Sequence, residues 1–89
     1  RGITFTITIE QALAKFINQN KQCALTGWPL TFSSKAKHQT ASLDRIDSSR
    51  GYEPNNIQWI NKTVNIAKLD FAQERFIEVC QSVVATHGK

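Results

Sequence analysis

The sequence predicts a small α+β domain in which helices flank a few short strands around one core. The chain has 89 residues, of which 40% are hydrophobic and 20% charged. That length suffices for a single hydrophobic core, so residues 1–89 are expected to form one domain. Apolar residues recur at helical spacing near both ends of the chain, and strand-like runs separated by turn residues lie between them. The composition is typical of globular proteins and not of disordered or low-complexity chains.

The first element predicted is a helix over residues 9–19. Residues 3–9 alternate between apolar residues and threonine, as a short strand would. However, Thr8 followed three positions later by Gln11 is a capping box, a pattern typical of a helix start. Apolar residues then follow at helical spacing: Ile9, Leu13, Phe16 and Ile17.

The segment after this helix is predicted to form a hairpin. Residues 23–25 and 30–32 are short apolar runs, and Gly27 lies in the connection between them. Glycine adopts the positive φ that a tight connection needs. Residues 33–39 are polar and basic and are therefore expected to form a loop.

Two further strands and a helix are predicted in the second half of the chain. Residues 40–46 and 57–60 have strand-like composition, and the intervening residues 47–56 are rich in turn formers. Asn61 is a suitable N-cap for the helix that follows. In that helix Val64 and Lys68 share one face, which leaves Asn65 one step away from it.

A long amphipathic helix is predicted at the C-terminal end. Asp70 and Gln73 form a second capping pattern. The apolar residues at helical spacing after it are Phe71, Phe76, Val79, Cys80, Val83 and Val84. The order expected is helix, hairpin, strand, long loop, strand, helix, helix.

Charge and cysteine content limit the kinds of partner and metal site that the chain is expected to have. Eleven lysine and arginine residues against seven acidic ones give a net charge of +4, which favours a polyanionic partner. The two cysteines, Cys23 and Cys80, cannot supply a four-ligand zinc site, so no structural zinc is expected. Both are interpreted as small buried hydrophobic residues, with one long-range disulfide as the less favoured alternative.

The sequence gives no support for a membrane role. Its apolar runs are far shorter than the ~20 residues of a membrane-spanning helix. The first residues lack the pattern of a signal peptide, so a cytoplasmic location is expected. The chain begins with Arg1 and not with methionine, which suggests a fragment of a longer protein.

Polar residues around the second predicted strand pair indicate a metal site. A strand pair that runs into a helix would bring Asp44, at the end of one strand, opposite Asn65 on the helix. Mg²⁺ is commonly held by one or two protein oxygens, with water and phosphate completing its shell. These residues therefore predict a phosphodiester site that uses Mg²⁺ or Mn²⁺.

The spacing of these residues resembles the motif of the HNH endonucleases. The segments 43–46 and 56–59, followed by Asn65 and Lys68, carry the resemblance, which covers about residues 23–68. The flanking segments 23–27 and 50–56 also look like those of phage and restriction-system HNH domains. The resemblance implies a ββα-metal core with an N-terminal helix and a long C-terminal helix. It also implies a single-metal endonuclease that hydrolyses DNA phosphodiester bonds.

The resemblance assigns roles to individual residues. Asp44 and Asn65 would be the metal ligands. Asn56 would hold the loop and orient the catalytic residue, and Lys68 would contact a phosphate. Further candidate contacts to DNA phosphates are the basic residues Lys35, Lys37, Arg50 and Lys62.

One departure from the family pattern concerns the general base. The family has a histidine after the aspartate, whereas this chain has Arg45, whose guanidinium cannot accept a proton near neutral pH. Three alternatives stay open. His38 in the basic loop could be the base. Solvent or the substrate phosphate could instead deprotonate the metal-bound water while Arg45 stabilises the transition state. The site could also bind DNA without cleaving it.

Two other functional classes are consistent with the sequence. One is a non-catalytic DNA-binding module with salt-sensitive backbone contacts. The other is a protein-interaction domain that docks through an exposed apolar stripe at Phe76, Val79 and Val83. A homodimer would explain double-strand cuts, but nothing in the sequence requires one.

Overall fold

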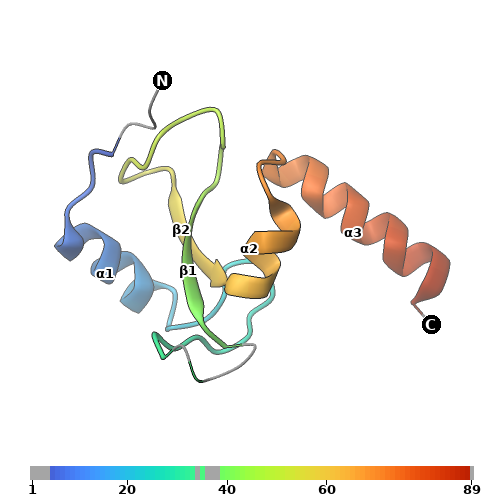
Figure 1. The fold of residues 1–89 in the computed structure, drawn as a ribbon, viewed down its shortest axis with the longest axis horizontal. Coiled ribbons are helices and arrows are strands. Elements are labelled where there is room, and N and C mark those ends of the chain that lie inside the picture. The colour runs from blue at the N-terminus through green and yellow to red at the C-terminus, as the bar shows by residue number, and fades with distance from the viewer. Residues whose placement is uncertain (1–4, 34, 36–38, 89) are drawn as a thin grey trace.

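A computed structural model describes residues 5–33, 35 and 39–88 of the chain. The described residues form an α+β fold with three helices and a two-stranded antiparallel sheet, which confirms the predicted fold class (Figure 1). The elements are α1 (Ile9–Asn18), β1 (Ala41–Arg45), β2 (Ile57–Asn61), α2 (Lys62–Lys68) and α3 (Gln73–His87). None of the described helices is both long enough and apolar enough to cross a bilayer.

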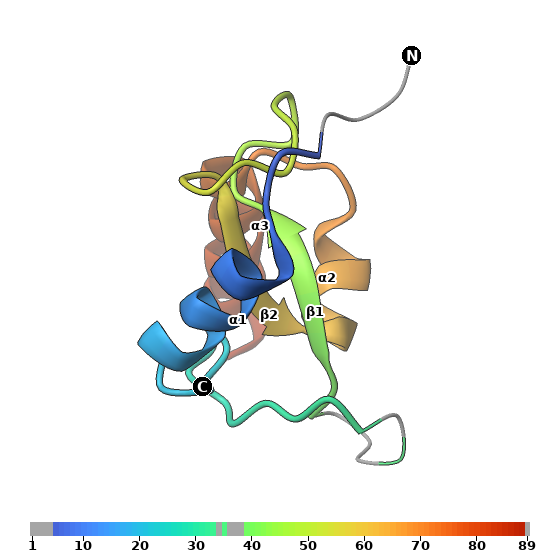
Figure 2. The ribbon, with the colours of Figure 1, turned by 90° about the vertical axis from the view of Figure 1, so that its left-hand side faces the viewer.

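The sheet lies between α1 and α2. β1 and β2 pair in a register that sets Ala41 opposite Asn61 and Arg45 opposite Ile57. α2 begins at the residue after β2 and contacts both strands, whereas α1 contacts β2. Figure 2 shows that α1 and α2 lie on opposite sides of the strand pair. Strand, strand and helix therefore follow one another as a ββα unit, in the order that the sequence predicts.

Helix α1 begins and ends close to where the sequence predicts. Thr8 Oγ1 accepts a hydrogen bond from Gln11 N at 3.0 Å, and Gln11 Oε1 accepts one from Thr8 N at 2.9 Å, so the capping box is confirmed. The helix is tied to the sheet by Trp59 Nε1, which donates to Ala12 O at 2.8 Å. Phe16 is buried next to the Trp59 ring. Of the apolar face that the sequence predicts, Phe16 is buried, whereas Ile9, Leu13 and Ile17 are exposed.

The predicted hairpin over residues 23–32 is wrong as a pair of strands. Among the described residues, this region has only isolated bridges, Gln22 with Pro29 and Thr31 with Thr40. The connection itself is tight, because Gly27 adopts a φ of 77° and its N–H donates to Cys23 O at 2.8 Å. Residues 3–9 likewise form no strand in their described part, where one bridge joins Phe5 to Tyr52.

The sulfur of Cys23 links this turn to the end of β2. Cys23 Sγ accepts hydrogen bonds from Thr26 N at 3.4 Å and from Asn61 N at 3.3 Å. Burial raises the pKa of the Cys23 thiol, but hydrogen bonds from Thr26 and Asn61 outweigh it and lower that pKa overall. Both cysteines are free thiols; Cys23 is buried as predicted, whereas Cys80 is exposed and its predicted burial is wrong.

The ends of α2 are set by local backbone chemistry. Asn61 Oδ1 accepts hydrogen bonds from Thr63 N at 2.8 Å and from Val64 N at 3.4 Å, which confirms the predicted N-cap. The helix ends where Leu69 adopts a φ of 51°. This conformation is unfavourable inside a helix of L-residues, so the chain turns away there.

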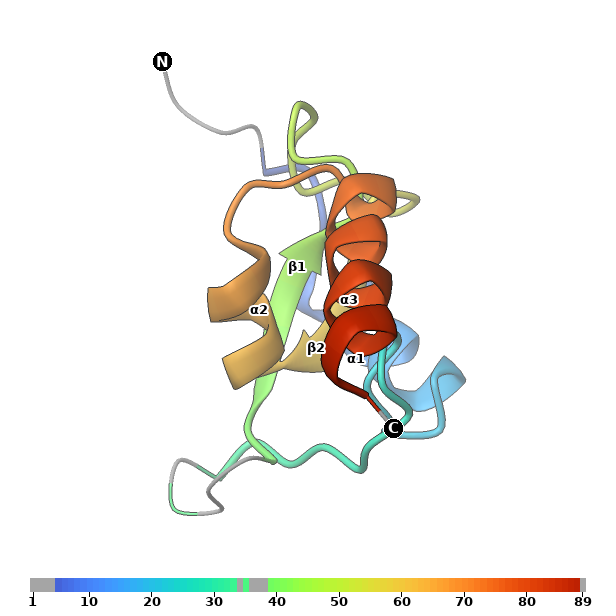
Figure 3. The same ribbon diagram turned by 90° about the vertical axis from the view of Figure 1, so that its right-hand side faces the viewer.

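Helix α3 starts in a different way from that predicted. Its N-cap is Ala72, which makes no side-chain cap, so the capping pattern of Asp70 and Gln73 is wrong. The side chain of Gln73 has another partner, because its Oε1 accepts from Gln58 Nε2 at 2.7 Å. The backbone carbonyl of Asp70 accepts from Ser48 Oγ at 2.7 Å. Figure 3 shows α3 in the foreground, and Figure 1 shows that α3 is set apart from the two strands, with α2 nearer to them. None of the residues of α3 is fully buried.

Candidate functional site

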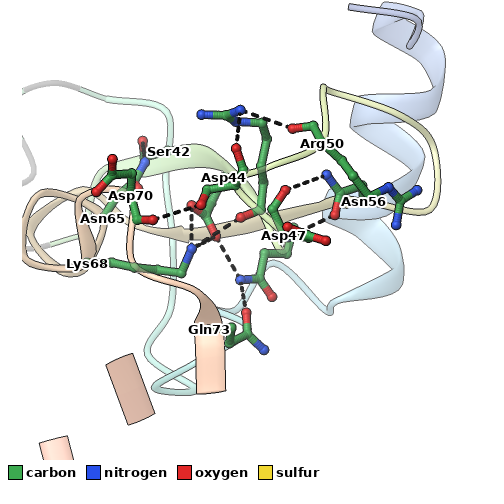
Figure 4. A network of polar contacts seen from close by, with 12 residues as sticks. Ser42, Asp44, Asp47, Arg50, Asn56, Asn65, Lys68, Asp70 and Gln73 are labelled. Carbon is green, nitrogen blue, oxygen red and sulfur yellow. Dashed lines mark hydrogen bonds and ion pairs between the residues drawn. The ribbon is translucent and has the colours of Figure 1, made fainter. Parts of the chain in front are cut away.

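The interface between β1 and α2 contains both predicted metal ligands, Asp44 and Asn65. Ser42 and Asp44 lie two positions apart on β1 and therefore share one face of the strand. Asn65 Nδ2 donates to Ser42 Oγ at 2.7 Å. One helical turn further, Lys68 Nζ lies 3.2 Å from Asp44 Oδ1 and 3.1 Å from Asp44 Oδ2. Asp44 and Asn65 are thus neighbours along the same interface (Figure 4).

The carboxylate of Asp44 is enclosed and fully partnered. Asp44 is only 6% exposed. In addition to Lys68, it accepts a hydrogen bond from Gln58 Nε2 at 2.9 Å. A buried charge is stable only when it is paired and hydrogen-bonded, and both conditions are met here.

Gln58 is a site residue that sequence reasoning missed. It is buried and lies directly opposite Asp44 in the strand pairing. Its amide donates both to Asp44 and to Gln73 at the start of α3. The available signal was a polar residue inside the apolar run 57–60, at a position that a hairpin register would pair with the strand end.

Lys68 is buried, unlike most lysines. Its side chain has no exposed surface, and Nζ also donates to Arg45 O at 3.2 Å. The resemblance implies that Lys68 contacts a phosphate. In the described conformation its ammonium is instead bound by three protein oxygens, so a phosphate contact requires this ion pair to open.

Arg45 anchors the loop between the strands. Its guanidinium donates through Nη1 to Ser48 O at 2.8 Å and to Arg50 O at 3.0 Å. It also lies 5.6 Å from the centroid of the Tyr52 ring, a cation–π distance. Arg45 therefore has a structural role that the sequence did not predict.

Asn56 closes the same loop. It is 1% exposed, its Oδ1 accepts from Asp47 N at 2.9 Å, and its Nδ2 donates to Asp47 O at 3.0 Å. A third hydrogen bond joins Nδ2 to Gly51 O at 2.8 Å. These contacts hold the loop as expected of Asn56, and its influence on a catalytic residue stays a prediction.

The predicted phosphate-contact residues are spread over several elements. The guanidinium of Arg50 is already paired with Glu53 Oε1 at 2.5 Å and with Asn55 Oδ1 at 2.9 Å. Lys35 and Lys62 are exposed, Lys62 as the first residue of α2. Lys37 and His38 lie outside the described residues.

Asp47 is an exposed carboxylate with a perturbed pKa. Ser49 Oγ donates to its Oδ1 at 2.6 Å, and Ser49 N donates to the same oxygen at 2.9 Å. These hydrogen bonds stabilise the charged form and hold the pKa of Asp47 below its ordinary value. The contacts stay within the turn, so Asp47 serves the loop and not the Asp44 interface.

The donor chemistry of the interface fits a hard divalent cation. Asp44 offers a carboxylate and Asn65 an amide oxygen, which are ligand types that Mg²⁺ and Mn²⁺ accept. No group of three or more His, Cys, Asp or Glu side chains that could hold a metal is found within residues 5–33, 35 and 39–88. Such a site would therefore depend on this one carboxylate and one amide, with water and phosphate as further ligands.

The arrangement around Asp44 has the element order of a ββα unit. The strand that carries Asp44, its antiparallel partner and the helix that carries Asn65 are consecutive elements of the regular structure. The family assignment stays a prediction. Protein-family models, curated proteins and solved structures were each compared with the chain, and none of them matches it.

Proposed function

We propose that this chain is a divalent-metal-dependent endonuclease domain that hydrolyses DNA phosphodiester bonds at the Asp44 interface. The observation that carries the proposal is the position of Asp44 and Asn65, which come from different elements and lie along one strand–helix interface. The net charge of +4 favours a polyanionic substrate. The loop that joins the strands is held by Arg45 and Asn56.

Each residue of the interface has a role in this proposal. Asp44 and Asn65 hold the cation, and Gln58 orients the Asp44 carboxylate through its amide N–H. When bound, a divalent cation supplies Lewis-acid chemistry: it activates water and stabilises charge on the phosphate and the leaving oxygen. Arg45 fixes the loop next to the end of β1 through its two carbonyl contacts.

The proton acceptor in this reaction is not Arg45. A guanidinium cannot accept a proton near neutral pH, and the hydrogen bonds to Ser48 O and Arg50 O use it as a donor. His38 stays a candidate for the base, and the alternative acceptors are solvent and the substrate phosphate. Nicking assays of His38→Ala and Arg45→His separate these routes. Loss of nicking activity in His38→Ala supports His38 as the base, and higher nicking activity in Arg45→His supports a base position next to Asp44.

Nicking of supercoiled plasmid in a series of divalent cations tests the proposal. Asp44→Asn keeps the shape of the side chain and removes its charge, and we expect it to reduce nicking by more than about 100-fold. Asp47→Asn is the matched control, because it makes the same change on an exposed carboxylate of the adjacent loop. Circular dichroism verifies that both variants are folded. Nicking by Asp44→Asn at the rate of the unmodified protein, or no nicking with any cation, would overturn the proposal.

A second candidate function is a DNA-binding module without catalysis. The ion pair of Asp44 with Lys68 favours it, because this pair neutralises the one carboxylate on which a metal site depends. Such a module binds DNA in EDTA as well as in Mg²⁺, with an affinity that falls as salt rises. Fluorescence anisotropy with a labelled duplex distinguishes the two: equal binding in EDTA together with no cleavage supports the module.

A further inference from the structure

We propose that the ammonium of Lys68 is an internal competitor of the divalent cation, so that a metal binds Asp44 only when Lys68 leaves it. This inference rests on the proposed metal site at Asp44. It adds a role for Lys68, which would control when the metal site is available. Figure 4 shows the ammonium of Lys68 beside the carboxylate of Asp44.

The ammonium of Lys68 lies where a cation would lie. It contacts Asp44 Oδ1 at 3.2 Å, Asp44 Oδ2 at 3.1 Å and Arg45 O at 3.2 Å. A carboxylate and a backbone carbonyl are also the oxygen donors that hard metal ions select. The side chains of Lys68 and Asp44 are 0% and 6% exposed, so the pair leaves little surface for a second cation to approach.

Charge makes the two cations mutually exclusive at this carboxylate. Two positive charges a few ångströms apart in a poorly solvated interface repel strongly, because the effective dielectric is far below that of water. Gln58 Nε2 also bonds Asp44 Oδ2, but as a neutral donor it has no such conflict with a metal ion. The orientation of the carboxylate can therefore persist while its cationic partner changes.

DNA supplies an alternative partner for Lys68. The residue is the last of α2, and Leu69 after it is 70% exposed, so this end of the helix is at the surface. A lysine side chain is long and flexible, and it binds phosphate as a point charge. A backbone phosphate that draws Lys68 away leaves Asp44 free, so DNA binding and metal binding support each other.

Mn²⁺ binding to the whole chain without DNA tests the competition. We compare the unmodified protein with Lys68→Met by isothermal titration calorimetry and by the electron paramagnetic resonance signal of free Mn²⁺. Lys68→Met is expected to bind Mn²⁺ at least about tenfold more tightly, because the repelling charge is gone. Lys21→Met is the matched control, an exposed lysine with the same change of charge. Equal Mn²⁺ affinity in Lys68→Met and Lys21→Met would overturn the proposal.

Two further variants test whether Lys68→Met is misfolded and whether Mn²⁺ binds at another site. Lys68→Gln removes the charge but keeps a hydrogen-bond donor for Asp44, and it should also bind Mn²⁺ more tightly. Mn²⁺ should raise the unfolding temperature of the Lys68 variants more than that of the unmodified protein. The double variant Asp44→Asn/Lys68→Met should lose the gain, and tight binding in it would overturn the proposal because the metal would lie elsewhere.

The outcomes separate this inference from the proposed function. DNA cleavage by the unmodified protein, with no gain of Mn²⁺ affinity in either Lys68 variant, overturns the competition and leaves the nuclease proposal intact. A gain of Mn²⁺ affinity with no DNA cleavage by any protein supports the competition and overturns the nuclease proposal.

Discussion

The β1–β2–α2 unit and helix α3 are both regular structure, but they are held in different ways. The unit contains side chains without appreciable exposure, among them Ile57, Ile60 and Asn61. α3 is longer than α1 or α2, and none of its residues is buried. The comparison shows that apolar residues at helical spacing predict a helix and do not by themselves predict how deeply that helix packs.

The contacts of α3 with the unit are partly polar and converge on the candidate site. Gln73, the first residue of α3, bonds Gln58, and Gln58 bonds Asp44. Further along, α3 borders an apolar groove of about 810 Å³. Of the apolar stripe expected for a protein-interaction helix, Val83 is 56% exposed, whereas Phe76 and Val79 are only partly exposed.

The largest expected difference between the two regions is in the cost of removing an apolar side chain. Ile60→Ala should lower the free energy of unfolding by about 2–5 kcal/mol, because Ile60 is fully buried and its truncation leaves a cavity in the core. Val83→Ala on α3 should change it by less than about 0.5 kcal/mol, because Val83 is exposed. Urea unfolding measures both. Equal losses would contradict the distinction between a buried unit and an exposed helix.

A smaller effect is expected in the loop that joins the two strands. Asn56→Ala removes three hydrogen bonds from a buried amide and should cost about 2–3 kcal/mol of unfolding free energy. Asn55→Ala is the adjacent control; its exposed side chain accepts one bond from Arg50, so about 0.5 kcal/mol is expected. The same urea experiment compares them. A larger loss of unfolding free energy for Asn55→Ala than for Asn56→Ala would show that the exposed contacts of the loop stabilise it more than the buried ones.

The polar link between the two regions gives a still smaller effect. Gln73→Ala removes the hydrogen bond to Gln58 and should cost about 1 kcal/mol. Amide hydrogen exchange should rise in the first turn of α3 and stay unchanged in β1 and β2, since the sheet keeps its own pairing. Faster exchange throughout β2 would show that the sheet depends on α3.

The smallest effect concerns pH and the exposed carboxylate of Asp47. Because the pKa of Asp47 is lowered in the folded state, its contribution to stability is present above the unfolded pKa of about 4 and is lost as pH falls through the folded pKa. Ser49→Ala removes the hydroxyl that donates to Asp47. We expect this variant to raise the pKa of Asp47 toward its ordinary value, as measured by NMR titration of the carboxyl carbon. An unchanged pKa would show that the Ser49 hydroxyl has no influence.

Local signals in the sequence were enough to predict much of the regular structure. The caps at Thr8 and Asn61 and the turn at Gly27 depend on contacts within a few residues, and each is confirmed. The capping pattern at Asp70 failed because Gln73 has a partner 15 residues away. A short-range pattern cannot reveal a long-range competitor for the same side chain.

The partners of the candidate site residues depend on tertiary packing. The spacing to Asn65 and Lys68 indicated which strand and helix meet, and it placed Lys68 on the same helix face as Val64. It could not show that Lys68 pairs with Asp44 or that Gln58 donates to the same carboxylate. Those contacts follow from the register of β1 and β2 together with the angle at which α2 leaves the sheet.

The most direct test of the central claim is the effect of Mn²⁺ on the amide NMR signals of the unmodified protein. Bound Mn²⁺ broadens nearby signals even when it binds weakly, so the experiment locates the ion without relying on cleavage. We expect selective broadening at Asp44 and Asn65, with Asp44→Asn abolishing it. Broadening confined to other residues, in the unmodified protein and in Lys68→Met alike, would contradict a cation site between β1 and α2.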